Sequence, residues 1–292
     1  MAEFIVSDGN FSLHRAWSAI GKRSAQPTVR VPLLMLEWFC SHAVRLGCSG
    51  GAIAFDGSEN FRYDVYSGYK SNRGGISVTI ESGPMGGLTL HDAVYASLKP
   101  AKELFKSLGI RVIHLKKFEA DDVMISAAWV LARNKPQNHV YLDTNDKDMI
   151  QGITENVSIY HAEMLNRPEE ILTLKTMPKM KHGLSPKQFL DLQILLGDGV
   201  DSIPAVPGIE KAEAIRMLKT HGRLSDFLKT PKGKEFYYAR ATELHRNKEL
   251  VMMSKKAFPY VEKDLSFKYL TGEAECRSFV ELRNSQRRRT LF

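Results

Sequence analysis

The sequence predicts an α/β fold in which helices cover both faces of a mostly parallel sheet. Two observations predict it: short apolar segments that resemble buried strands, and stretches between them whose apolar residues have helical spacing. The strand segments are residues 4–6, 51–55, 111–115, 139–142 and 157–160. Strands that alternate with helices in this way imply a parallel sheet with both faces covered.

Helical periodicity is clearest in three stretches of this first part. They are residues 33–44, 94–108 and 123–131. Residues 74–90 are different, because they are rich in glycine and contain no Lys or Arg. We therefore expect a long flexible loop, or a disordered excursion, over 74–90.

From about residue 181 the periodicity is purely helical, so we place a domain boundary there. Ser185 is a candidate N-cap, with Pro186 at the first position of a helix that runs to Leu196. A second helix follows Gly208 and ends at Gly222. The predicted organisation is an α/β domain over 1–180 and a helical subdomain over 181–292.

The composition is that of an ordinary globular protein. Of the 292 residues, 43% are hydrophobic and 25% are charged. These values argue against disorder, a collagen-like fibre and a disulfide-stapled miniprotein. We expect no signal peptide and no membrane contact, and the three cysteines without CxxC pairing indicate buried, reduced thiols in a cytoplasm.

The net charge of +8 is unevenly distributed along the chain. Residues 1–180 contain 20 Lys and Arg against 19 Asp and Glu, whereas residues 181–292 contain 21 against 14. A near-neutral first part and a basic second part suggest that the second part binds a polyanion.

Acidic residues follow four of the predicted strands. They are Asp8, Asp56, Glu119, Asp121, Asp122, Asp143, Asp146 and Asp148. Each alone could be a helix cap or a turn residue. Ligands of open α/β sheets gather at the carboxyl ends of strands, so together these side chains predict one acidic rim. An all-oxygen site suits Mg²⁺, and two such ions about 3.5–4 Å apart serve phosphodiester hydrolysis.

Six ordered motifs resemble those of the 5′-nuclease (flap endonuclease) family, which includes phage 5′–3′ exonucleases and the 5′-nuclease domain of bacterial DNA polymerase I. The motifs are Val6–Asn10, Ala54–Gly57, Gly68–Arg73, Glu119–Asp122, Asp146–Asp148 and Gly197–Ile209. The resemblance covers residues 1 to about 220. It implies a PIN-like nuclease domain with two metal sites, of the stand-alone phage type. It also implies that residues of about 74–95 form a flexible, arch-like segment over the single strand.

The resemblance assigns metal ligands residue by residue. Asp8, Asp56, Glu119 and Asp121 match the tighter site, and Asp146, Asp148 and Asp201 match the second. Asp122 and Asp198 are placed among or next to these ligands, and the alignment of Asp143 is open. The implied cofactor is Mg²⁺ at both sites, with Mn²⁺ as a substitute.

The Gly68–Arg73 motif supplies further candidates. Lys70 and Arg73 are expected to face the scissile phosphate, with Arg15 beside them, and Tyr69 to be a platform on which a displaced base stacks. Without the motif, the two cations would be surface residues and Tyr69 an ordinary half-buried aromatic.

The segment Gly197–Leu218 resembles the family's helix–three-turn–helix element, which binds duplex backbone. Its expected contacts are Val206, Gly208, Ile209, Lys211 and Arg216. The resemblance also implies a K⁺ ion held here by backbone carbonyls. Ala205 and Glu210 stand where the family usually has Gly, which predicts altered phosphate geometry. Without the motif, this would be a turn between helices.

The resulting hypothesis is a monomeric, Mg²⁺-dependent, structure-specific 5′ nuclease acting in replication on DNA with a 5′ flap, a nick or an RNA primer. It would work in the cytoplasm, that of the host cell if a phage encodes it. The alternatives are a PIN-type ribonuclease on single-stranded RNA and a non-catalytic DNA-binding protein. The tail, residues 284–292, is a solvated terminus or a docking peptide for a sliding clamp or a single-strand-binding protein.

Overall fold

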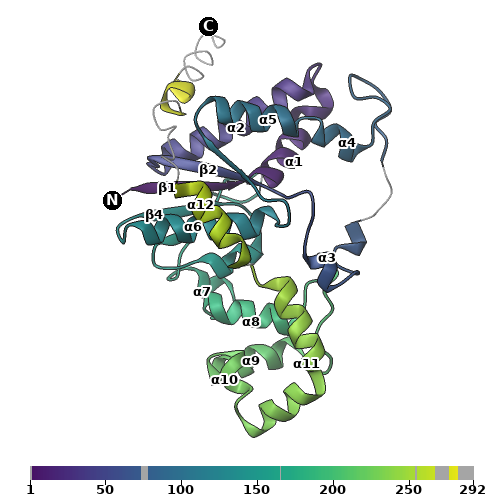
Figure 1. Ribbon diagram of the computed structural model, residues 1–292, viewed down its shortest axis with the longest axis vertical. Coiled ribbons are helices and arrows are strands. Elements are labelled where there is room, and N and C mark those ends of the chain that lie inside the picture. Colours follow the sequence, from purple (N-terminus) through teal and green to yellow (C-terminus); the bar gives the residue numbers. More distant parts are fainter. Residues whose placement is uncertain (1, 74–77, 165, 254, 267–275, 282–292) are drawn as a thin grey trace.

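A computed structural model of the chain describes residues 2–73, 78–164, 166–253, 255–266 and 276–281 (Figure 1). The molecule is elongated. An α/β unit forms one end, and a small group of helices around α8–α11 forms the other end (Figure 1). Helix α11 runs between them. In the part of the chain that is described, none of the helices has the length and apolar character that a bilayer crossing requires.

The sheet has six strands in the order β3-β2-β1-β4-β5-β6. The strands are β1 (Glu3–Asp8), β2 (Gly50–Phe55), β3 (Arg111–His114), β4 (His139–Asp143), β5 (Val157–His161) and β6 (Glu170–Leu172). The first five are parallel to their neighbours, and β6 pairs antiparallel with β5. The five predicted strands and the α/β class are confirmed; β6 was missed because three residues are too few to show a period.

Helices connect the strands and build the subdomain. They are α1 (Gly9–Ile20), α2 (Pro27–Arg45), α3 (Arg62–Val65), α4 (Leu90–Tyr95), α5 (Leu98–Ser107), α6 (Ala120–Asn134), α7 (Met177–Met180), α8 (Pro186–Leu196), α9 (Lys211–His221), α10 (Leu224–Phe227), α11 (Pro231–Val251) and α12 (Phe258–Ser266). Four short 3₁₀ turns are η1 (Gly21–Arg23), η2 (Ser71–Arg73), η3 (Lys147–Gly152) and η4 (Lys255–Ala257).

The two faces of the sheet bury separate apolar clusters. Side chains alternate between the faces of a strand, so Val6 of β1 packs with α6 on one side and Ile5 packs with α2 and α5 on the other. Phe39 and Phe105 meet edge to face within the second cluster, 5.4 Å between ring centroids. Both faces are therefore covered, as a parallel sheet requires.

The helical subdomain has its own core between α8, α9, α10 and α11. Helix α8 begins as predicted: the Ser185 hydroxyl accepts from the backbone N–H of Gln188, and the Gln188 side chain accepts from the N–H of Ser185. Helix α9 ends at Gly222, whose φ of +82° favours glycine. Helix α11 bends at Arg240, where φ is −141°.

The chain after α11 returns to the α/β unit. The helical subdomain therefore does not include all of residues 181–292, contrary to the prediction from the sequence. Helix α12 packs against α6 with Val261 fully buried, and Cys276 is buried against α2. The separate core involves residues from about 184 to 244. Helical periodicity shows that a segment has an apolar face, but it does not show which surface that face covers.

The glycine-rich segment is more ordered than predicted over the residues that are described. Thr79 pairs with Thr89, whose hydroxyl then caps α4 by accepting from the N–H of Asp92. Ile80 and Met85 pack on the α2 side of the core. Residues 74–77 lie outside the described part of the chain.

Candidate active site

The first group of carboxylates lies where β1 and β2 end. Asp8 is the last residue of β1 and caps α1, accepting from the N–H of Phe11 at 2.9 Å. Asp56 follows β2 and accepts from the Asn10 amide at 2.6 Å and from the N–H of Ala120 at 2.8 Å. The last bond joins the end of β2 to the start of α6, which is the helix that carries Asp121.

Glycine at position 57 makes this junction sterically feasible. A Cβ atom at Gly57 would lie 2.2 Å from the carbonyl oxygen of Leu115. The chain after β2 can therefore lie directly against the chain after β3, with the N–H of Gly57 donating to the carbonyl of Phe118 at 2.8 Å. Two strand ends thus bring their carboxylates to one edge.

The second group of carboxylates comes from η3 and from the loop after α8. Asp146 caps η3 and accepts from the N–H of Asp148 at 2.8 Å. Asp198 and Asp201 lie in a tight loop, which an Asp198–Ile203 bridge closes. The Tyr69 hydroxyl, 3.1 Å from Asp201, ties this loop to the first group of carboxylates.

Electrostatic repulsion indicates that the first group of carboxylates lies close to Asp146 of the second group. The pKa of Asp8 is raised to about 7, mainly by burial and further by Asp56 and Asp146. Burial also raises the pKa of Asp121 well above its usual value, and Asp8, Asp146, Glu119 and Asp56 add to this effect. Side chains from four chain segments therefore feel one another's charge, as the sequence predicted.

Two lysines offset part of the negative charge. Lys70 pairs with Glu119, and Lys147 pairs with Asp198. Burial alone would raise the pKa of Glu119, but Lys70 and Arg62 lower it below its usual value. The pKa of Asp148 remains raised to about 7, by burial first and then by Asp146, because Lys147 compensates only in part.

A small cavity of about 10 Å³ lies between the two groups. Its acidic lining consists of Glu119, Asp121, Asp148, Asp198 and Asp201. Among the side chains that the structure describes, no three His, Cys, Asp or Glu residues are grouped tightly enough to hold one ion as they stand. The donor chemistry nevertheless fits a divalent cation, because oxygen donors line a site whose carboxylates repel one another.

Asp122 is used for structure and not for the acidic rim. Its side chain is fully buried, and its two oxygens accept from Arg62 at 2.7 and 2.9 Å. Asp122 therefore lies next to the expected ligand Glu119, whose N–H donates to it, which is one of the two placements expected for it. Asp143 is similarly committed, to Ser7 at 2.8 Å and to His42 at 3.0 Å.

Tyr69 and Arg15 differ from expectation. Tyr69 is only 2% exposed, and its hydroxyl donates to Glu119 at 2.8 Å, so it cannot stack on a displaced base. Arg15 lies over Trp38 and donates to the carbonyl of Glu163, beside a separate cavity that Asp143 lines. It does not join Lys70 at the acidic edge.

Lys70 lies beside Glu119 and Asp201 at the acidic edge, in an unusual backbone conformation. Its φ is +53°, and its N–H donates to the carbonyl of Asp201 at 2.8 Å. Left-handed geometry is costly for a residue with a Cβ, so the contact with the 198–203 loop is what holds it. The Arg73 side chain lies outside what the structure describes, so its expected role stays a prediction.

The loop before α9 presents backbone at the subdomain surface. Gly208 has a φ of +75° and is exposed, as are Lys211 and Arg216. Val206 is instead only 1% exposed, and its N–H donates to the carbonyl of Leu195, so its expected contact with DNA is wrong. Ile209 is half-buried.

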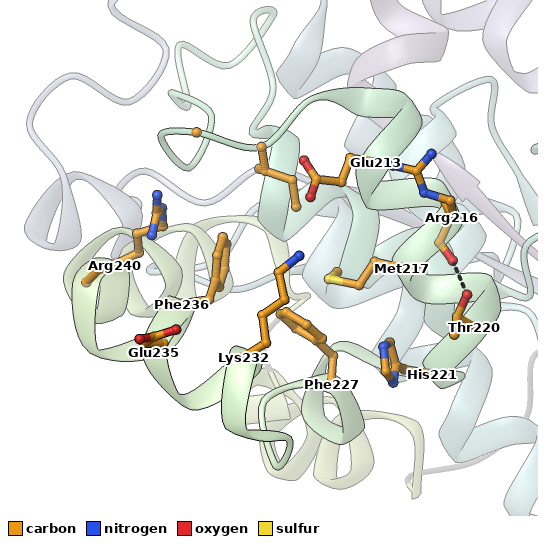
Figure 2. Close-up of a pocket in the computed structure, with 13 residues that line it drawn as sticks. Glu213, Arg216, Met217, Thr220, His221, Phe227, Lys232, Glu235, Phe236 and Arg240 are labelled. Atoms are coloured by element: carbon orange, nitrogen blue, oxygen red, sulfur yellow. Dashed lines mark hydrogen bonds between the residues drawn. The ribbon is translucent and has the colours of Figure 1, made fainter.

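A pocket of about 610 Å³ opens beside this loop, between α9, α10 and α11 (Figure 2). Arg216, Lys232 and Arg240 contribute positive charge to its wall, and Glu213 and Glu235 contribute negative charge. Arg240 donates to the carbonyl of Pro207 at 2.5 Å. The bend of α11 therefore supports the loop from behind.

Comparison with known proteins connects this geometry with a family. The model of the 5′–3′ exonuclease N-terminal resolvase-like domain matches residues 3–180, which is more than half of the chain. This chain belongs to the 5′–3′ exonuclease family. The match covers the strands and most of the carboxylates described above, which explains why the acidic edge resembles a nuclease site.

Relatives in the family include proteins named 5′–3′ exonuclease and DNA polymerase I. A 5′–3′ exonuclease of Buchnera aphidicola subsp. Schizaphis graminum is 32% identical over 175 residues, which are 60% of this chain and 54% of that protein. The thermostable DNA polymerase I of Thermus caldophilus is 32% identical over 180 residues, 61% of this chain and 19% of the polymerase. The chain thus spans about half the length of the first relative.

The likeness to solved structures extends over the helical subdomain. A bacteriophage T5 protein co-crystallised with metal ions has a TM-score of 0.70 at 20% identity, covering 96% of this chain and 97% of that one. A complex of the T5 flap endonuclease with DNA and metal ions has a TM-score of 0.68 at 20% identity, covering 96% and 99%. The whole exonuclease-family fold is therefore present here.

Sequence reasoning missed the residues that hold the carboxylates of this exonuclease-family site. Asn10 positions Asp56, and Arg62 binds both Asp122 and Glu119. The only local feature of the sequence that could have indicated the role of Arg62 is its place between two aromatic residues, Phe61 and Tyr63, after a strand.

Proposed function

We propose that this exonuclease-family protein is a divalent-metal-dependent, structure-specific 5′ nuclease that hydrolyses DNA carrying a 5′ flap, a nick or an RNA primer. The observation that supports it most strongly is that carboxylates from separate chain segments converge on one edge, where burial and the charges of Asp56 and Asp146 raise the pKa values of Asp8 and Asp121. Such repulsion is relieved when a cation binds.

The residues divide into two sets of candidate ligands. Asp8, Asp56, Glu119 and Asp121 would hold one Mg²⁺ or Mn²⁺, and Asp146, Asp148, Asp198 and Asp201 would hold the second. When bound, the ions supply an activated water and charge stabilisation for the leaving oxygen. The protein fixes where the phosphate lies relative to these carboxylates.

Lys70 is the cation best placed to face that phosphate. It pairs with Glu119, lies 4.0 Å from Asp201, and is held by a strained backbone. A positive group at this edge would stabilise negative charge that develops on the phosphate oxygens. Tyr69 keeps Glu119 and Asp201 at fixed positions beside it.

The subdomain would bind the duplex without reading sequence. Its exposed loop at Gly208, with Lys211 and Arg216 on the following helix, offers backbone N–H groups and positive charge to phosphates. A K⁺ ion bound by the loop carbonyls would strengthen this grip, so replacing K⁺ by a large organic cation should weaken duplex binding. Deleting residues 284–292, which lie outside the described part, tests a tail that docks on a clamp or a single-strand-binding protein.

The deciding experiment uses 5′-labelled flap, nicked and blunt DNA, an RNA-primed duplex and unpaired RNA, with Mg²⁺. A short labelled product from the flap indicates endonuclease action, and labelled mononucleotides indicate exonuclease action. Asp121→Asn should abolish cleavage but retain DNA binding in Ca²⁺, whereas Asp64→Asn, at an exposed carboxylate of α3, should leave both unchanged. Full cleavage by Asp121→Asn would refute the metal assignment, and equal cleavage of unpaired RNA would favour a ribonuclease.

A further inference from the structure

Arg62 is a buried cation at the junction of three elements. Only 2% of its surface is exposed, yet it lies at the start of the short helix α3. Its guanidinium donates to both oxygens of Asp122 and lies 3.1 Å from Glu119, and its Nε donates to the carbonyl of Leu250 at 2.8 Å. A planar guanidinium can satisfy such a bidentate arrangement, whereas a lysine ammonium cannot.

Asp122 transmits this contact to the acidic edge. Besides binding Arg62, Asp122 accepts from the N–H of Glu119 at 3.2 Å, which closes the first turn of α6. Asp121 stands between these two residues in the chain. Arg62 therefore fixes the turn that presents Glu119 and Asp121 to the cavity between the two carboxylate groups.

The partner at Leu250 gives this turn a second support. Leu250 is in the last turn of α11, and the next carbonyl, of Val251, accepts from the Gln151 amide at 3.1 Å. Gln151 belongs to η3, which also carries Asp148, and its amide donates to the Asp148 carbonyl at 3.0 Å. One end of α11 is thus bound to elements of both candidate metal sites.

We infer that Arg62 is a positioning residue, which holds the first turn of α6 so that Glu119 and Asp121 face the cavity where a divalent cation would bind. The inference rests on the proposed function, because it concerns the same carboxylates. Groups that orient metal ligands through hydrogen bonds typically contribute 10–100-fold to metal affinity or activity. Arg62 has no access to solvent and would act without touching the substrate.

The test is Arg62→Lys, with Mn²⁺ binding measured by titration calorimetry in the absence of DNA. We expect affinity for the tighter ion to fall about 10–100-fold, and kcat in Mg²⁺ to fall similarly. Affinity for flap DNA in Ca²⁺ should change less than about twofold, because the loop at Gly208 is untouched. Arg133→Lys is the matched control: Arg133 is on α6, the helix that carries Asp122, but it forms an exposed pair with Glu262.

The outcomes separate this inference from the proposed function. If the unaltered protein binds no Mn²⁺ and cleaves no DNA, the proposed function fails. If it does both, and Arg62→Lys binds Mn²⁺ as tightly while remaining folded by circular dichroism, the inference is wrong. Should Arg62→Lys unfold, the uncharged pair Arg62→Gln with Asp122→Asn removes the buried charges; unchanged Mn²⁺ affinity in that variant would equally overturn the inference.

Discussion

At the acidic edge, the position of a side chain could be predicted from the sequence only where a general rule of sheet topology applies to it. Asp8 and Asp56 lie at the edge because parallel strands end there. The hydrogen-bond partners of the other carboxylates were not predictable. Tyr69 contacts Glu119 and Asp201, for example, which are 50 and 132 positions away in the sequence. A motif identifies such a tyrosine as important, but only the packing shows that it is buried.

Burial of Tyr69 leads to a prediction that distinguishes support from base stacking. In Tyr69→Phe, Glu119 and Asp201 lose a donor while the ring volume stays, so kcat should fall about tenfold, the effect of one lost hydrogen bond of about 1.4 kcal/mol. Affinity for flap DNA in Ca²⁺ should not change. Tyr63→Phe, at the exposed neighbouring ring, is the control. Because a phenylalanine ring can still stack on a base, an unchanged kcat would instead favour stacking over support by the hydroxyl.

His161 should make stability depend on pH. It is 8% exposed, and burial, followed by the positive charges of Arg167 and Lys181, lowers its pKa to about 4, against a smaller opposing effect of Asp143. Below pH 6.5 the unfolded chain binds a proton that the folded chain does not, so stability falls as pH drops from 6.5 to about 4.

The measurement is urea unfolding at pH 7.5 and pH 5. The decrease in the free energy of unfolding from pH 7.5 to pH 5 should be about 1–2 kcal/mol smaller in His161→Gln than in the unaltered protein, after allowing for solvent screening. An equal loss in both proteins would show that His161 does not contribute.

At the scale of elements, hydrophobic periodicity predicted which segments form helices and strands, but not the surfaces on which they pack. The helices α8 and α9 begin and end close to where capping residues indicated, because a cap acts locally. Strand β6 and the packing of α12 were not predictable, because β6 is three residues long and α12 depends on a distant surface of α6. Within the glycine-rich segment, the packing of Ile80 and Met85 was not predictable, because glycine content does not reveal such contacts.

The loop before α9 gives a prediction at this scale. A Cβ at Gly208 would lie 2.8 Å from the Arg240 guanidinium, in addition to the strain of a φ of +75°. Gly208→Ala should therefore displace Arg240 from the Pro207 carbonyl and weaken duplex binding about 3–10-fold, the effect of about 1 kcal/mol of backbone strain.

The control separates the effect of a side chain at a positive φ from the effect of the contact with Arg240. Gly222→Ala places a methyl group at a similar φ of +82° with no atom within 4 Å, so it should lower stability but leave DNA affinity in Ca²⁺ unchanged. Equal losses of affinity in the two variants would mean that Arg240 has no part in supporting the loop.

For the whole molecule, the family match and the packing place the domain boundary differently. The match ends at residue 180, but α12 and residues 276–281 cover α6 and α2 of the matched part. A fragment of residues 1–180 should therefore expose apolar surface on both helices. We expect it to unfold at a clearly lower urea concentration than the full chain and to bind an apolar dye. A fragment as stable as the full chain would show that this cover is dispensable.

Helix α11 is attached to the rest of the molecule at two points. Arg240 donates to the carbonyl of Pro207, and ten residues later the carbonyl of Leu250 accepts from Arg62. Ten residues of helix separate the two attachments, a length of about 15 Å. Helix α11 therefore sets the distance between the Gly208 loop, next to which Arg240 is attached, and the turn of α6 that Arg62 holds.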